Sequence, residues 1–297
     1  MPSDNLRAAL LMLASMAGFV VNDTFVKLAS AELATAQIMA LRGIAASAFL
    51  FLLAWRFGAL RPPALLKNPR LLLRTVTDVL ATLTYITALG QMPIANASAV
   101  FQALPLVITL AAALLFKEPV GCRRWTALAV GFLGVMIIVK PGTEGFNVYS
   151  LAVLASVLAS AVRDLTTRRM DRAVPSLFIS LVTAVGVTLV GWLLIPLTGG
   201  WQPVSAPVAA YLCGAALAIA IGYIFIVQAM RVGEAGFVAP FRYSILLYAL
   251  IIGFVVFGDL PSATTLFGSA VVVASGVYTL YRERVRGLTK VARTQVH

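Results

Sequence analysis

The sequence consists largely of ten apolar runs of about 20 residues each. The short segments between these runs contain proline, glycine and most of the basic residues. A run of this length suits an α-helix that crosses a membrane, because helices and closed barrels are the structures that satisfy every backbone hydrogen bond there. Charged residues make up only 11% of the chain, against about 25% in a soluble domain. The chain is therefore predicted to be an all-α integral membrane protein.

The apolar runs predict ten transmembrane helices joined by short loops. The first run directly follows the N-terminus and is longer than a signal-peptide core, so we expect it to be a membrane span. The expected ranges are 7 to 29, 35 to 57, 70 to 90, 94 to 116, 122 to 140, 148 to 167, 175 to 197, 207 to 230, 235 to 257 and 262 to 282.

The basic residues indicate the orientation of these helices. With the N-terminus inside, 18 of the 23 basic residues fall in cytoplasmic segments, and only Lys27 and Lys140 fall outside. Arg42, Arg163 and Arg242 lie within spans. The positive-inside rule then predicts that both termini are cytoplasmic, in a protein of a bacterial-type inner membrane.

The two halves of the chain resemble each other at a constant shift of 141 residues. The tripeptide at 13–15 recurs at 154–156, and Asp23 recurs as Asp164. We expect two five-helix repeats, residues 1–141 and 142–297. Because five is odd, the second repeat enters the membrane from the opposite side, and such inverted repeats typically hold a substrate site at their interface. This arrangement predicts an alternating-access transporter.

The chain also resembles a known family. The likeness rests on the duplicated five-helix unit and on residues at fixed places in it. These residues are Ala88, Leu89, Ala95, Pro105, Leu106, Glu118, Gly131 and Gly134 in the first half, and Asp259 and Gly276 in the second. The pattern is similar to the EamA family of the drug/metabolite transporter superfamily. In the second half Leu246 stands where the first has Pro105, so a matching helix break is not expected there.

The resemblance implies a central cavity lined by the first, third and fourth helices of each half. Within the superfamily the chain is most similar to YddG-type bacterial exporters of aromatic and neutral amino acids. Export as the direction of transport, and amino acids as substrates, are implied by this resemblance alone.

Ionisable residues inside a bilayer are costly and point to function. Asp23 and Arg42 lie at matching depths, as do Asp78 and Arg242, so each couple is expected to pair. Arg74 competes for Asp78 at i, i+4 spacing. Either pair can be a fixed ion pair that only neutralises two buried charges. In the functional alternative, Arg242 attracts a substrate carboxylate and Asp78 binds an ammonium group or a coupling proton.

Arg163 and Asp164 are expected near the cytoplasmic end of the sixth helix. A long arginine side chain there often extends to the headgroups, although Asn22 and Asp23 at the repeat positions also make an ion-pair role possible. Glu118 and Asp259 end the fourth and ninth helices, and we interpret them as hydrated loop or cap residues.

Neutral polar and aromatic residues concentrate in the helices that are expected to line the cavity. The predicted substrate-binding residues among them are Tyr85, Phe101, Gln102, Tyr223 and Tyr243. An aromatic wall suits an amphipathic ligand, whereas interhelical hydrogen bonding is the alternative role. Further members of this set are Thr77, Thr82, Asn96, Gln228, Ser244 and Tyr248.

Several function classes have no support in the sequence. No phosphate-binding loop is present, and His297 is the single histidine, so neither ATP hydrolysis nor a catalytic metal is expected. The basic residues lie between apolar runs, which disfavours nucleic acid as a partner. Cys122 and Cys213 are expected to be packing residues.

The leading prediction is a cofactor-free secondary transporter, with a small-molecule substrate and the bilayer as partners, that exports aromatic or neutral amino acids. The alternatives are a carrier of another metabolite or drug-like amphiphile, or a non-transporting receptor or scaffold; the sequence predicts no oligomeric state.

Overall fold

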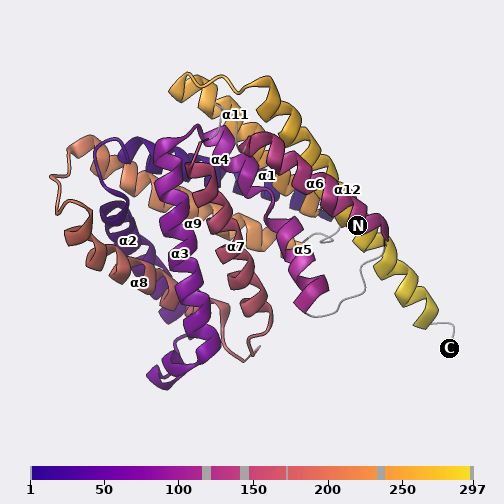
Figure 1. The fold of residues 1–297 in the computed structure, drawn as a ribbon. Coiled ribbons are helices and arrows are strands. Elements are labelled where there is room, and N and C mark those ends of the chain that lie inside the picture. The colour runs from indigo at the N-terminus through magenta and orange to yellow at the C-terminus, as the bar shows by residue number, and fades with distance from the viewer. Residues whose placement is uncertain (1, 116–121, 141–146, 172, 233–237, 295–297) are drawn as a thin grey trace. The chain divides into compact units, whose positions relative to one another are not determined.

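In a computed structural model of the chain, which describes residues 2–115, 122–140, 147–171, 173–232 and 238–294, every regular element is helical (Figure 1). Glu118 and His297 lie outside the described residues. The helices of the first half are α1 (Pro2–Ala29), α2 (Thr35–Arg56), η1 (Pro63–Lys67), α3 (Pro69–Gln91), α4 (Ile94–Phe101), α5 (Leu104–Leu115) and α6 (Cys122–Val139). Those of the second half are α7 (Tyr149–Arg168), α8 (Ser176–Leu194), η2 (Ile195–Thr198), α9 (Ala206–Val232), η3 (Ala239–Tyr243), α11 (Ser244–Phe257) and α12 (Ala263–Thr294).

These elements confirm the predicted all-α fold with ten helical segments, since α4 with α5 and η3 with α11 each occupy one predicted span. Eight segments in the described residues are long and apolar enough to cross a membrane, and Trp125–Val139 and Ala263–Thr279 are shorter apolar helices. One boundary differs clearly, because α12 continues to Thr294 instead of ending near residue 282. The expectation that Cys122 and Cys213 are packing residues is wrong, since both are exposed.

The chain forms two compact units, and each unit takes segments from both halves of the sequence. Unit 1 consists of Met1–Val20, Ser98–Asn147 and Ile221–His297. Unit 2 consists of Val21–Ala97 and Val148–Ala220. Each unit therefore contains contacts between the two repeats.

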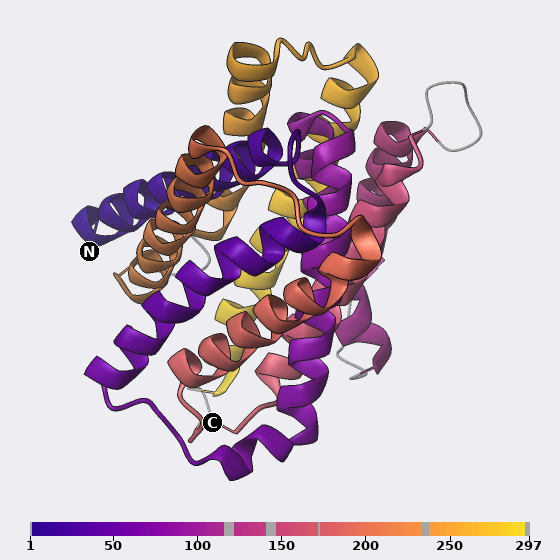
Figure 2. The same ribbon diagram turned by 90° about the vertical axis from the view of Figure 1, so that its left-hand side faces the viewer.

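In unit 2, α2 packs along α8 and α3 packs along α7 (Figure 2). Small residues permit the first contact, because a Cβ atom added to Gly191 would lie 2.6 Å from the backbone nitrogen of Ala40. The hydroxyls of Ser47 and Thr188 are 3.3 Å apart across the same pair of helices. These two residues differ by the repeat shift of 141, so the repeat axis passes through this contact.

In unit 1, α6 lies alongside α12 (Figure 1). A Cβ on Gly134 would be 3.0 Å from the Gly268 carbonyl oxygen, and a Cβ on Gly268 would be 2.8 Å from the Gly134 carbonyl oxygen. Ser275 donates a hydrogen bond of 2.5 Å to the Ala127 carbonyl on α6. The two fifth helices of the repeats thus approach backbone to backbone, as small residues in membrane helices allow.

The fourth helix of each half changes its winding at the same repeat position. In the first half α4 ends at Phe101 and α5 begins at Leu104. In the second half η3 ends at Tyr243, the repeat position of Gln102, and α11 begins at the next residue, Ser244. The described residues 238–257 therefore change helix type without a gap like that between α4 and α5. Pro240 lies at the start of η3, where proline is tolerated because the N–H that it lacks has no partner within the helix.

Candidate functional site

The charged and polar residues of unit 2 gather along one face of α3. The helix begins after Asn68, whose side chain accepts a hydrogen bond of 2.9 Å from the backbone N–H of Arg70. Asp78 and Tyr85 are seven residues apart, which is close to two helical turns, so they lie on the same face about 10 Å apart along the axis. Each of them belongs to a separate cluster.

The first of these, the Arg163 cluster, consists of Asp78 of α3 with Arg163 and Asp164 of α7. Arg163 Nη1 lies 2.6 Å from Asp78 Oδ1, and Arg163 Nε lies 2.8 Å from Asp164 Oδ1. One planar guanidinium thus binds two carboxylates through different edges. The side chains are mostly enclosed, with 23% of Arg163, 20% of Asp78 and 39% of Asp164 exposed.

This geometry gives the partners of Arg163 and leaves one expected pair open. Arg163 binds the carboxylate of Asp78 on the neighbouring helix α3, which corresponds to the ion-pair alternative for this residue. Arg74 does not displace it, since its guanidinium donates to the hydroxyls of Thr167, at 2.9 Å, and Thr183. Arg242 belongs to unit 1, so its pairing with Asp78 stays a prediction.

The second, the Asp23 cluster, consists of Asn22 and Asp23 of α1, Arg42 of α2 and Tyr85 of α3. The Tyr85 hydroxyl donates to Asp23 Oδ2, and Asn22 Nδ2 donates to Asp23 Oδ1, both at 2.9 Å. Arg42 Nη1 donates to Asn22 Oδ1, also at 2.9 Å. Asn22, which the sequence marked only as a repeat position, therefore links the predicted couple of Asp23 and Arg42.

The two clusters are related through the repeat. Asn22 and Asp23 occupy the repeat positions of Arg163 and Asp164, and both dipeptides contact α3. Two interhelical hydrogen bonds are also related by the repeat. The Ser156 hydroxyl donates a hydrogen bond of 2.8 Å to the Ala81 carbonyl in unit 2, and the Ser15 hydroxyl donates one of 2.7 Å to the Gly222 carbonyl in unit 1. Both residues of the second bond lie at the repeat positions of the first.

The chemistry along the third helices, in contrast, is asymmetric. The repeat positions of Asp78 and Tyr85 in α9 are Ile219 and Ile226. The polar face is thus a property of α3 alone among this pair of helices. A site that needs charge is therefore expected on α3.

The remaining predicted site residues lie in unit 1, most of them near the ends of α4 and η3. Phe101 and Gln102 are partly buried where α4 ends, and Arg242 is exposed at the repeat position of Phe101 in η3. Tyr243 is 6% exposed, and its hydroxyl has no hydrogen-bond partner among the described residues. Tyr223 of α9 is 57% exposed and contacts Phe19 edge to face, with 5.3 Å between ring centroids.

Comparison with known proteins gives the family. The EamA-like transporter family matches residues 6–140 and again residues 147–281. A riboflavin transporter of Vibrio cholerae is 30% identical over 207 residues, which are 69% of this chain and 68% of that protein. The pseudopaline exporter CntI of Pseudomonas aeruginosa is 28% identical over 89% of this chain and 93% of that protein.

More distant relatives extend the same likeness. An S-adenosylmethionine uptake transporter of Rickettsia felis is 24% identical over 65% of each chain. A crystal structure that covers 92% of this chain and 98% of its own has a TM-score of 0.59 at 19% sequence identity, a likeness of fold. The chain therefore belongs to the EamA-like transporter family, as a multi-pass membrane protein that is a secondary transporter of small metabolites and not an enzyme.

Proposed function

We propose that this transporter exports small zwitterionic metabolites, with neutral and aromatic amino acids as the leading class, across a bacterial-type inner membrane by alternating access. The observation that carries the proposal is the Arg163 cluster, in which one guanidinium on α7 binds a carboxylate of α3 and a carboxylate of α7. An ion pair of this kind offers a recognition group for each end of an amino-acid zwitterion.

Exchange of partners is the step by which such a cluster recognises a zwitterion. The substrate carboxylate replaces Asp78 on Arg163, and the substrate ammonium group binds the carboxylate of Asp78 that is released. Every charge keeps a partner throughout, which avoids the large cost of leaving a single charge unpaired in a low-dielectric region. The second partner of Arg163, Asp164, holds the guanidinium in place during the exchange.

The rest of the ligand is assigned to the aromatic and apolar residues. Tyr85 lies about two turns from Asp78 on the same face of α3, at a separation that suits the side chain of an aromatic amino acid. Phe101, Gln102, Tyr223, Arg242 and Tyr243 belong to unit 1 and stay predicted substrate-binding residues on the strength of the sequence.

The named relatives support organic substrates of this general kind. Riboflavin carries an aromatic ring system, and S-adenosylmethionine carries an α-amino-acid group together with an aromatic base. Their names include both an exporter and an uptake transporter, so export is supported by the resemblance to YddG-type proteins and by no feature of the site. The distribution of basic residues supports cytoplasmic termini.

Counterflow in liposomes tests the proposal. Purified protein is reconstituted, the vesicles are loaded with unlabelled ligand, and uptake of labelled Phe, Trp, Met, Leu, Thr, riboflavin or S-adenosylmethionine is followed. We expect saturable counterflow of at least one amino acid, reduced about tenfold or more in Arg163→Gln, which leaves two carboxylates without their cation. Arg61→Gln is the matched control, because Arg61 lies in an exposed loop and donates to nearby carbonyls.

Two outcomes contradict the proposal. Counterflow of riboflavin or S-adenosylmethionine without any amino acid assigns the protein to another metabolite class. Equal loss of flux in Arg163→Gln and Arg61→Gln removes the role of the Arg163 cluster.

A further inference from the structure

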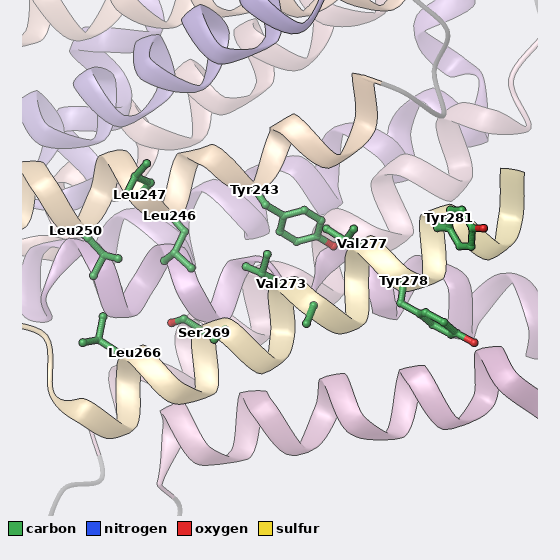
Figure 3. A pocket seen from close by; sticks show the side chains of 12 residues that line it. Tyr243, Leu246, Leu247, Leu250, Leu266, Ser269, Val273, Val277, Tyr278 and Tyr281 are labelled. Carbon is green, nitrogen blue, oxygen red and sulfur yellow. The ribbon is translucent and has the colours of Figure 1, made fainter.

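A long apolar groove in unit 1 lies between α11 and α12. Its volume is about 780 Å³, which is within the range of small-molecule sites. Leu246 and Leu250 point from α11 toward Leu266 and Ser269 of α12, and Tyr243 lies in the same groove (Figure 3). The lining is hydrocarbon apart from the hydroxyls of a few side chains. An apolar ligand suits this surface.

The groove is open along its length. Leu247 is 58% exposed, Leu266 is 45% exposed and Tyr281 is 60% exposed. In a chain that spans a membrane, apolar side chains exposed on the spans meet lipid rather than water. The ligand that reaches the groove most readily is therefore a lipid chain.

The groove is longer than the hydrocarbon part of one leaflet. Its lining on α12 runs from Leu266 to Tyr281, a helical distance of about 22 Å. The hydrocarbon core of a bilayer is about 30 Å thick, so one leaflet contributes about 15 Å. The acyl chain of a single phospholipid therefore fits in the part of the groove that is nearest one end, with the headgroup at that end.

The sequence after Tyr281 identifies that end. The helix α12 continues to Thr294, and residues 282–294 contain five basic residues and one acidic residue. Basic residues directly beyond a membrane helix attract anionic lipid headgroups. The basic residues are Arg282, Arg284, Arg286, Lys290 and Arg293, and the acidic residue is Glu283.

We propose that the groove between α11 and α12 binds one anionic phospholipid. Its acyl chain lies along Leu246, Val273 and Val277, and its phosphate lies at the basic segment that follows Tyr281. The hydrocarbon lining provides affinity, and the basic segment provides selectivity for an anionic headgroup. The proposal is independent of the transported substrate and of the Arg163 cluster.

Native mass spectrometry of delipidated full-length protein tests this site. Dioleoyl phosphatidylglycerol and dioleoyl phosphatidylcholine have the same chains and differ in headgroup charge, so their titrations separate the two contributions. We expect one bound phosphatidylglycerol per chain, with an affinity about tenfold or more above that of phosphatidylcholine. Thermal unfolding with each lipid provides a second readout, since a lipid that binds only the folded chain raises its Tm.

Two variants locate the site. Ala274→Trp places a large side chain in the groove and is expected to reduce binding of both lipids about tenfold. Ala45→Trp adds the same atoms at an exposed position of α2 and is expected to leave binding unchanged. The triple variant Arg282→Gln, Arg284→Gln, Arg286→Gln is expected to reduce phosphatidylglycerol binding to the level of phosphatidylcholine. Ala270→Leu, a smaller change in the same groove, replaces Ala274→Trp if that variant does not elute as a single species.

Three results overturn the proposal. Equal binding of the two lipids to the wild-type chain would show that the site does not select an anionic headgroup. Unchanged binding in Ala274→Trp and Ala270→Leu places the lipid elsewhere. A dimer that Ala274→Trp dissociates assigns the groove to contact between two copies of the chain.

Discussion

At the scale of single residues, Asp78 and Tyr85 each connect α3 to a dipeptide at a repeat-related position. Asp78 binds Arg163 of α7, and Tyr85 donates to Asp23 of α1. The two dipeptides are repeat mates, yet α9 carries no counterpart of Asp78 or Tyr85. The effects of substitution are therefore expected to be concentrated on α3.

The Tyr85 hydroxyl provides a direct check of this arrangement. Tyr85→Phe removes one donor to Asp23 and is expected to lower the free energy of unfolding by about 1 kcal/mol, the scale of a hydrogen bond to a carboxylate between membrane helices. Tyr211→Phe is the control, because the Tyr211 ring, which is retained, stacks on Phe25 with 6.0 Å between centroids. Thermal unfolding in detergent measures both, and equal stability of the two variants contradicts a role for the hydroxyl.

The sequence predicted which residues are charged inside the membrane but not all of their partners. Position within an apolar run indicates the depth of Asp78 and of Arg163. Which of several arginines binds Asp78 depends on the lateral contact between α3 and α7, and no local pattern encodes that contact. The repeat shift did carry a usable signal, since it relates Arg163 and Asp164 to Asn22 and Asp23.

At the scale of the elements, hydropathy predicted helices well because a membrane span must be a continuous apolar segment. The span expected at 35 to 57 is α2, Thr35–Arg56, and the one expected at 148 to 167 is α7, Tyr149–Arg168. Hydropathy cannot reveal a break between two apolar segments. The change from η3 to α11 at Ser244 likewise lies inside the apolar span expected at 235 to 257, so hydropathy did not indicate it.

The repeated serine contacts test whether the two halves pack by the same rule. Ser15 and Ser156 are buried repeat mates that donate to the carbonyls of Gly222 and Ala81. Ser15→Ala and Ser156→Ala are each expected to cost about 1 kcal/mol of unfolding free energy, because each leaves a buried carbonyl with one hydrogen bond fewer. Ser180→Ala on α8 is the control. A cost for one serine and none for its mate contradicts equivalent packing of the repeats.

At the scale of the whole molecule, each unit is built from both repeats, and the distribution of basic residues predicts the orientation of the chain in the membrane. The native thiols make this orientation measurable. Cys122 is exposed at the start of α6, next to Arg123 and Arg124, which the positive-inside rule places in the cytoplasm.

In a Cys213→Ser background, we expect an impermeant maleimide to label Cys122 in inverted vesicles and not in right-side-out vesicles, because the thiolate reacts where it meets water. The reference is Thr198→Cys in a chain without Cys122 and Cys213, since Thr198 is exposed in a loop predicted on the outer side. Labelling of Cys122 from outside would reverse the predicted topology.

If the polar face of α3 carries the transport step, Asp78→Asn is expected to impair transport. Counterflow of labelled phenylalanine, or of the substrate that the liposome screen identifies, is compared in the wild-type protein, Asp78→Asn and Asp259→Asn. Asp259 is the matched control, because it lies just beyond Gly258, which ends α11 with φ of 69°. We predict a loss of about tenfold or more in Asp78→Asn, corresponding to about 1.4 kcal/mol or more, and near wild-type flux in Asp259→Asn. Full flux in a folded Asp78→Asn protein would exclude Asp78 from the transport step and limit the Arg163 cluster to a structural role.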